Sequence, residues 1–186
     1  MACAVATLNS TTGCANNTGG VAYSWACKLE DITAVTLTGT PSVISNFTMA
    51  STGLWKRLDY DKNDTSRFDQ VGERLNETGA LRYNGEAFLQ FGGHNETYKA
   101  FADDLGDCCK LVFIHVLTNG KRVVQGIELT AASPFFTGAL LRDTKVVPSQ
   151  MSGTAAEEAR LELLVQGRTV KLAPYTTITD TALAAL

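Results

Sequence analysis

Residues 109–129 read CKLVFIHVLTNGKRVVQGIEL and carry the strongest hairpin signal in the chain. Two runs of apolar and β-branched residues flank Thr118-Asn119-Gly120-Lys121. Asn-Gly supplies the positive φ angles that a type I′ turn needs, so the stretch predicts a tight β-hairpin. The first strand is apolar on both faces, with Val112, Ile114 and Val116 on one and Leu111, Phe113, His115 and Leu117 on the other. Such a strand lies at the centre of a sandwich or is covered by a helix, so we expect Phe113 and Ile114 to be buried on opposite faces.

Short segments with a period of two residues predict a mostly β protein. In residues 21–29 every second side chain is apolar, which is typical of a half-buried strand. Residues 159–165 lie in a stretch whose composition also suits a helix, but the alternation of Leu161, Leu163 and Val165 favours a strand. The other expected strands are 32–37, 43–49, 87–91, 140–147 and, after a turn at 166–168, 169–172.

One helix is expected, at residues 95–105. Its apolar residues recur at i, i+3, i+4 and i+7 from Tyr98 to Leu105, which forms one apolar stripe. Asn95 can cap its start and Gly106 can end it. We therefore predict a single domain over residues 1–186, a two-sheet β-sandwich or small barrel with one short flanking α-helix and a long projecting hairpin. Residues 1–20 would form an N-terminal arm, and residues 173–186 a C-terminal tail with no strong structural signal.

The segment at residues 55–82 differs from its surroundings, because charges of both signs are dense and its apolar residues are spread out. Such a segment buries little by itself. It is either a surface loop or a long hairpin that reaches away from the core and is ordered by a partner. The hairpin is favoured, because a structureless connection of this length is uncommon. Opposite charges pair across interfaces, so the expected subunit-interface residues are Asp59, Tyr60, Asp61, Arg67, Phe68, Asp69, Glu73 and Arg74.

Composition and charge argue against several classes of function. The chain has 16 Lys and Arg against 19 Asp and Glu, a net charge of −3, which gives no electrostatic reason to grip a phosphate backbone. No apolar run approaches the ~20 residues that cross a bilayer, so no membrane partner is expected. The N-terminus lacks the charged and apolar regions of a signal peptide, which indicates synthesis in the cytoplasm. Five cysteines, an odd number without a C-x-x-C pair, favour free thiols over a disulfide framework or a zinc site.

Patterns for catalysis or cofactor binding do not emerge. Of the two histidines, His115 lies in the most apolar strand and His94 follows a Gly-Gly pair, so core and loop roles are favoured over catalysis. Neither G-x-G-x-x-G nor a P-loop follows a strand. Asp59, Asp61 and Asn63 have the early spacing of a calcium loop, but the glycine of its sharp turn is missing. We expect no catalytic, cofactor-binding or metal-ligating residues, and a protein that is not an enzyme.

The order of the expected elements resembles that of the major tail tube proteins of long-tailed bacteriophages. The shared order is a charged hairpin segment (55–82), a short helix (95–105), a hairpin with an Asn-Gly turn (109–129) and a late strand after a Ser-Gly linker (159–165). Residues 17–21, NTGGV, and residues 29–35, LEDITAV, are also similar to the starts of structural proteins of phages that infect Bacteroidetes-type bacteria. The resemblance covers residues 17–172 and does not include the cysteine-bearing stretch through Cys14.

The resemblance implies a virion protein of the viral tail, made in the cytoplasm of a host bacterium. In that family a β-sandwich with one flanking helix forms homo-hexameric rings, which stack into a tail tube for genome ejection. The implied partners are copies of the chain, other tail proteins, and DNA that passes through the lumen without specific binding. The alternatives are another ring-forming virion protein (a tail terminator, head–tail connector or decoration protein) and a non-viral adhesion or binding β-sandwich. A lumen must not hold DNA, so Lys121 and Arg122 are expected at the rim, on the exterior or in ion pairs.

Overall fold

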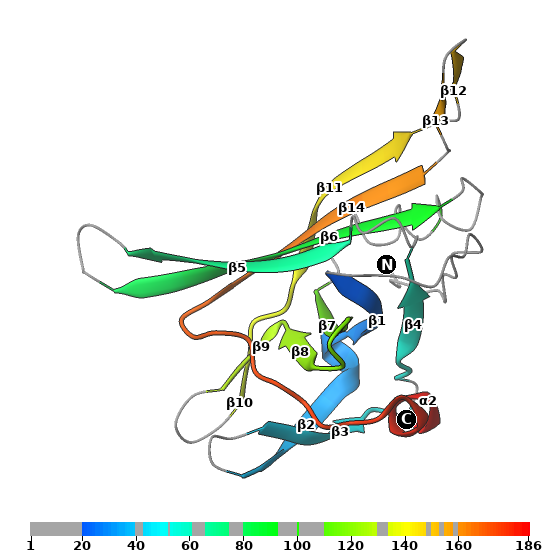
Figure 1. Cartoon of the computed structure of the whole chain (residues 1–186). Helices are drawn as coiled ribbons and strands as arrows, with labels where there is room; N and C mark the ends of the chain where they lie inside the picture. Colours follow the sequence, from blue (N-terminus) through cyan, green and yellow to red (C-terminus); the bar gives the residue numbers. More distant parts are fainter. Residues whose placement is uncertain are drawn as a thin grey trace.

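Two four-stranded antiparallel sheets pack face to face in the computed structural model of the chain (Figure 1). The structure describes residues 20–39, 43–51, 53–60, 66–74, 80–92, 100, 110–129, 134–147, 150–152, 155–157 and 160–186. The expected N-terminal arm up to residue 19, the helix at 95–105 apart from Ala100, and Asp61 lie outside these residues. The described part is mostly β, as the sequence predicts, with a short helix, α2 (Asp180–Ala185), near the C-terminus.

The predicted hairpin forms from β7 (Leu111–Leu117) and β8 (Arg122–Gln125). Its turn differs from the type I′ expectation. The Gly120 N–H donates to the Leu117 carbonyl, and the Leu117 N–H donates to the Lys121 carbonyl. This is a three-residue loop, in which a turn over residues 117–120 ends in a left-handed residue, Gly120 with φ 79°. The type I′ prediction is therefore wrong, although the glycine serves the same purpose, because residues with a side chain disfavour positive φ.

β7 lies inside the sheet that we call the central sheet, with the order β4-β1-β7-β8. β1 (Val21–Lys28) pairs with β7 on one side and with β4 (Lys56–Asp59) on the other. The second sheet, which we call the outer sheet, has the order β11-β14-β6-β5. Its strands are β5 (Arg67–Arg74), β6 (Leu81–Gly92), β11 (Leu140–Val147) and β14 (Arg160–Thr169).

Three two-stranded units complete the described strands. After the 3₁₀ turn η1 (Leu29–Asp31), β2 (Ile32–Thr38) pairs with β3 (Val43–Met49). The others are β9 (Ile127–Leu129) with β10 (Pro134–Phe136), and β12 (Gln150–Ser152) with β13 (Ala155–Glu157). Gly126 joins β8 to β9 with φ 98°, and a Cβ there would lie 2.8 Å from the Leu111 carbonyl oxygen, so the position requires glycine.

Both faces of the central sheet are buried. Phe113 faces the outer sheet and packs with Leu89, Phe91 and Leu163, whereas Ile114 faces the opposite side. Both side chains are 0% exposed, which confirms the prediction for β7. The opposite side is covered by the β2–β3 hairpin and by C-terminal residues, so the molecule has three layers (Figure 1).

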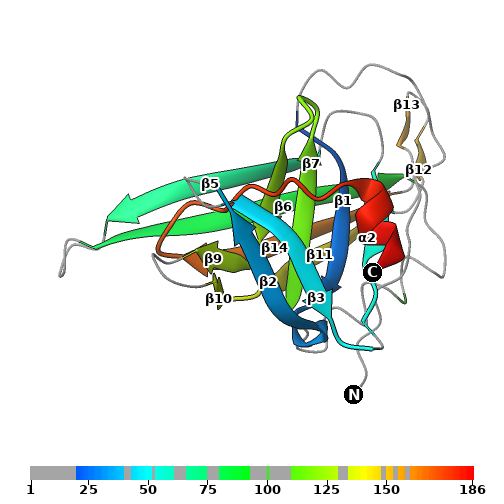
Figure 2. The ribbon, with the colours of Figure 1, turned by 90° about the horizontal axis from the view of Figure 1, so that it is seen from below.

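The expected C-terminal tail, residues 173–186, is an integral part of the fold. Residues 174–186, which we call the C-terminal strap, run across the central sheet (Figure 2). The main chain of the strap exchanges hydrogen bonds with Arg122 and Val124 of β8 on one side and with Ile44 of β3 on the other, with N···O distances of 2.8 to 3.1 Å. The strap therefore joins the central sheet to the β2–β3 hairpin.

The turn expected at residues 166–168 is also wrong. β14 continues to Thr169, because Gly167 and Arg168 pair in register with Gly85 and Asn84 of β6. A separate strand at 169–172 is consequently absent from the described residues, and β6 is longer than the predicted 87–91.

Phe113→Ala is expected to lower the free energy of unfolding by roughly 3–5 kcal/mol, because it leaves a cavity between the two sheets. Urea unfolding followed by circular dichroism measures this change. Val71→Ala, at a side chain that is 63% exposed, is the control and should change the free energy by less than about 0.5 kcal/mol. A loss below about 1 kcal/mol for Phe113→Ala would contradict the packing between the sheets.

Candidate assembly surface

β5 and β6 extend beyond the outer sheet as a two-stranded overhang (Figures 1 and 2). β14 pairs with β6 as far as Thr169↔Tyr83, whereas β5 pairs with β6 on to Arg74↔Leu81. We call residues 73–74 and 81–82 the ribbon. All four of its side chains are exposed, so both of its faces meet solvent. The hairpin predicted within residues 55–82 is therefore present, displaced toward the end of that segment.

The start of the predicted segment belongs to the core. Trp55, Leu58 and Tyr60 are at most 5% exposed, because β4 adds to the edge of β1 and turns them inward. Tyr60 packs edge-on against Phe91 with ring centroids 5.2 Å apart, and burial raises the pKa of its hydroxyl. The expectation that Tyr60 lies on a contact surface is wrong for this chain.

Several of the predicted interface charges pair within the chain. Arg57 contacts Asp59 at 2.9 Å, and Arg67 contacts Asp69 at 3.0 Å, each two residues apart on one face of a strand. Glu73 and Arg74 have no ion-pair partner among the described residues, so of the described members of the predicted set they are the charges left for an external contact.

Phe68 packs the start of β5 against the core. Its ring stacks on His115 at 4.7 Å between centroids, and Phe113 lies 5.6 Å from the same imidazole. The sequence assigned Phe68 to an interface, whereas the structure places it as a half-buried anchor of β5.

His115 belongs to a buried polar network that connects the two sheets. The Gln125 amide nitrogen donates to the Gly85 carbonyl at 3.0 Å, which turns its Oε1 toward His115 Nε2, also at 3.0 Å. Nε2 therefore carries the proton, and Nδ1 accepts from the Ser24 hydroxyl at 2.7 Å. Burial lowers the pKa of His115 from 6.5 to about 4, although the Gln125 hydrogen bond acts in the opposite direction. Ser24, His115 and Gln125 are at most 3% exposed, so no substrate reaches this serine and histidine, and the network is structural.

Asp180 fixes the strap to the central sheet. It accepts hydrogen bonds from the Tyr23 hydroxyl at 2.5 Å, from Trp25 Nε1 at 2.9 Å and from Arg122 Nη1 at 2.6 Å. Partial burial acts to raise the pKa of Asp180, but these donors outweigh it and hold the pKa at about 2. Sequence reasoning missed this contact, for which the local signal is Thr179, an N-cap whose hydroxyl accepts from the Ala182 N–H.

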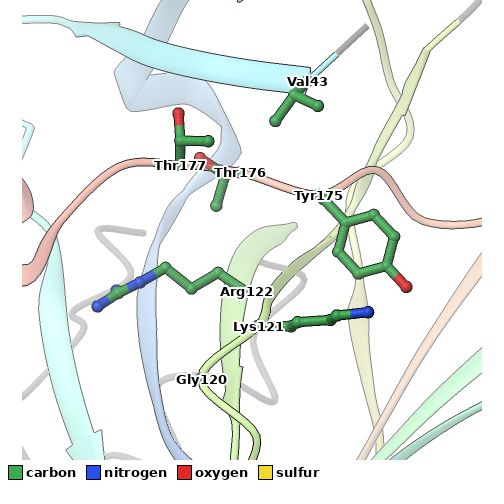
Figure 3. A pocket seen from close by; sticks show the side chains of 7 residues that line it. All are labelled: Val43, Gly120, Lys121, Arg122, Tyr175, Thr176 and Thr177. Atoms are coloured by element: carbon green, nitrogen blue, oxygen red, sulfur yellow. The ribbon is translucent and has the colours of Figure 1, made fainter. Parts of the chain in front are cut away.

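A pocket of about 430 Å³ lies between the β7–β8 turn and the strap (Figure 3). The two cations of the turn point in opposite directions within it. Arg122 extends to Asp180, and the Lys121 ammonium lies 5.8 Å from the centre of the Tyr175 ring. Both cations of this turn therefore interact within their own chain.

A second pocket, of about 130 Å³, lies on the solvent face of the outer sheet at the base of the ribbon. Arg82, Arg168, Glu73, Tyr83 and Asn84 line it. Sequence reasoning missed both arginines as site residues, because only the register of β14 on β6 brings them to the same face.

No family model, curated protein or solved structure matches the chain. Among the described residues, no helix is long and apolar enough to span a membrane, and no group of three His, Cys, Asp or Glu side chains is arranged to hold a metal ion.

Lowering the pH is expected to destabilise the protein through His115. A neutral buried histidine contributes stability that is fully present above pH 6.5 and is lost as the pH falls toward 4, because the unfolded chain binds the proton first. The loss amounts to roughly 3 kcal/mol, at about 1.4 kcal/mol for each pH unit of the shift. Urea unfolding at a series of pH values measures it. His115→Gln should flatten the pH dependence in this window and His94→Gln should not, whereas equal slopes for His115→Gln and the wild type would contradict the assignment.

Asp180→Ala is expected to lower the free energy of unfolding by about 1–3 kcal/mol, because the indole and guanidinium donors lose their acceptor. Hydrogen exchange should also accelerate in the strap more than in β7, since the strap loses its anchor. Thr181→Ala, at an exposed neighbouring side chain, is the control. Unchanged exchange in the strap of Asp180→Ala would show that other contacts hold it.

Proposed function

We propose that the chain is a structural subunit that assembles with copies of itself. The observation that carries the proposal is the ribbon, which extends beyond β14 with both faces in solvent. A two-stranded hairpin alone is at best marginally stable in water. Contacts with a partner would therefore stabilise the ribbon.

The edges of the outer sheet support self-association. Among the described strands, β5 and β11 each have a hydrogen-bonding neighbour on one side only. Open edges offer unpaired N–H and C=O groups and are places where sheets from different chains join. The two edges differ in sequence, so a contact between them would be head-to-tail, the geometry that generates rings or filaments.

In its specific form, the proposal is a tail tube subunit of a long-tailed bacteriophage, forming hexameric rings that stack into a conduit for DNA. The β-sandwich, the projecting hairpin and the acidic chain support this form, as does the resemblance in the order of elements. A tail terminator or another ring-forming virion protein shares these features. Stacking distinguishes the two, because a terminator stops at one ring.

Negative-stain microscopy of the concentrated purified protein tests the proposal. Stacked rings or tubes are expected. Single rings would favour a terminator or connector. A chain that stays monomeric at high concentration would overturn self-assembly itself.

Replacing residues 73–82 by Asn-Gly should abolish assembly and leave a folded monomer. The new two-residue turn would connect Gly72 to Tyr83, which are paired in register, and would leave Phe68 and all of β14 in place. Circular dichroism reports the fold, and sedimentation velocity reports assembly. Tubes of normal length from this variant would show that the ribbon is not the contact.

A further inference from the structure

We propose that the pocket between Arg82 and Arg168 on the outer sheet receives an acidic side chain from a neighbouring copy of the chain. This inference rests on the proposed self-assembly and assigns the chemistry of one of its contacts.

The register of the outer sheet places both guanidinium groups around one pocket. Arg168 of β14 lies opposite Asn84 of β6, and Arg82 is two residues along β6, so all three face away from the core. Both arginines are exposed and line the same pocket of about 130 Å³. Neither forms an ion pair with a described residue.

No carboxylate of the described residues forms an ion pair with either arginine. Glu86, the next acidic residue on this face of β6, accepts instead from the side-chain amides of Asn84 at 2.8 Å and Gln166 at 2.5 Å. Glu73 lies opposite Arg82 and also lines the pocket, without reaching ion-pair distance. The described residues that line the pocket therefore carry two guanidinium groups and one carboxylate, an excess of one positive charge.

A carboxylate of a second copy fits this pocket in charge, size and place. The chain as a whole carries a net charge of −3, so another copy presents more acidic than basic groups to a cationic pocket. The volume is below the roughly 300 Å³ at which small-molecule sites begin, and a guanidinium holds a carboxylate in a two-pronged hydrogen-bonded pair. Arg82 is itself a ribbon residue, so a copy that covers the ribbon also reaches the pocket.

Charge reversal in the full-length chain tests the inference. Arg82→Glu and Arg168→Glu should each raise the concentration needed for assembly by about tenfold or more in sedimentation velocity, because reversal places like charges together. Lys110→Glu is the matched control, since Lys110 is an exposed cation that belongs neither to the ribbon nor to the lining of the pocket. Its assembly should stay within about twofold of the wild type. Arg168→Lys keeps the charge but loses the planar fork, so an intermediate effect is expected. Thermal unfolding of each variant shows that it folds.

Each other outcome counts against the inference in a different way. Assembly of Arg168→Glu at the wild-type concentration would overturn this inference and leave the proposed function standing. Equal losses in all three glutamate variants would indicate general electrostatics and would also overturn it. If inorganic phosphate raises the melting temperature of the wild type but not of Arg168→Glu, while both assemble alike, the pocket takes a free anion instead. A wild type that never assembles overturns both proposals.

Discussion

A strand that is apolar on both faces imposes the layered structure of this protein. β7 presents Phe113 to one side and Ile114 to the other, and each must be removed from water. The outer sheet covers the first side. The second side needs a separate cover, which the β2–β3 hairpin and the strap provide together. The long-range pairing of β1, the register of β14 and the path of the C-terminus all serve this double burial.

Polar contacts fix how the three layers sit on one another, because apolar contacts alone are not directional. Between the central and outer sheets, the amide of Gln125 hydrogen-bonds His115 on one side and the main chain of β6 on the other. Between the central sheet and the strap, Asp180 collects three donors. A buried polar group without a partner would cost free energy, so each network favours one arrangement of its layers.

The strands were predictable where apolar side chains recur at every second residue. This held for β1 and β14, whose alternation is local to the sequence, whereas β7 was predicted from an apolar run that ends at an Asn-Gly turn. The strap was not predictable in this way, since its hydrogen bonds go to β8 and β3, which are distant in the chain. The prediction that the charged segment lies on the surface from Trp55 onward was wrong for a similar reason. β4 is buried only through its pairing with β1, which is distant in the chain. The candidate site was predictable in part for the same reason. Glu73 and Arg74 were predicted from the density of charges in their segment, whereas Arg82 and Arg168 come together only through the register of β14 on β6.

The distribution of cations links assembly to the passage of DNA in the proposed tube. A channel wall with unpaired arginines would hold DNA through the release of its counterions. Arg122 is already paired with Asp180, and Lys121 lies against Tyr175. Both cations of the β7–β8 turn therefore have a partner within their own chain. Arg82 and Arg168 lack such a partner among the described residues. In a DNA conduit these two arginines would have to be covered by a neighbouring copy. The proposed contact at the Arg82–Arg168 pocket would therefore also keep unpaired arginines out of the lumen.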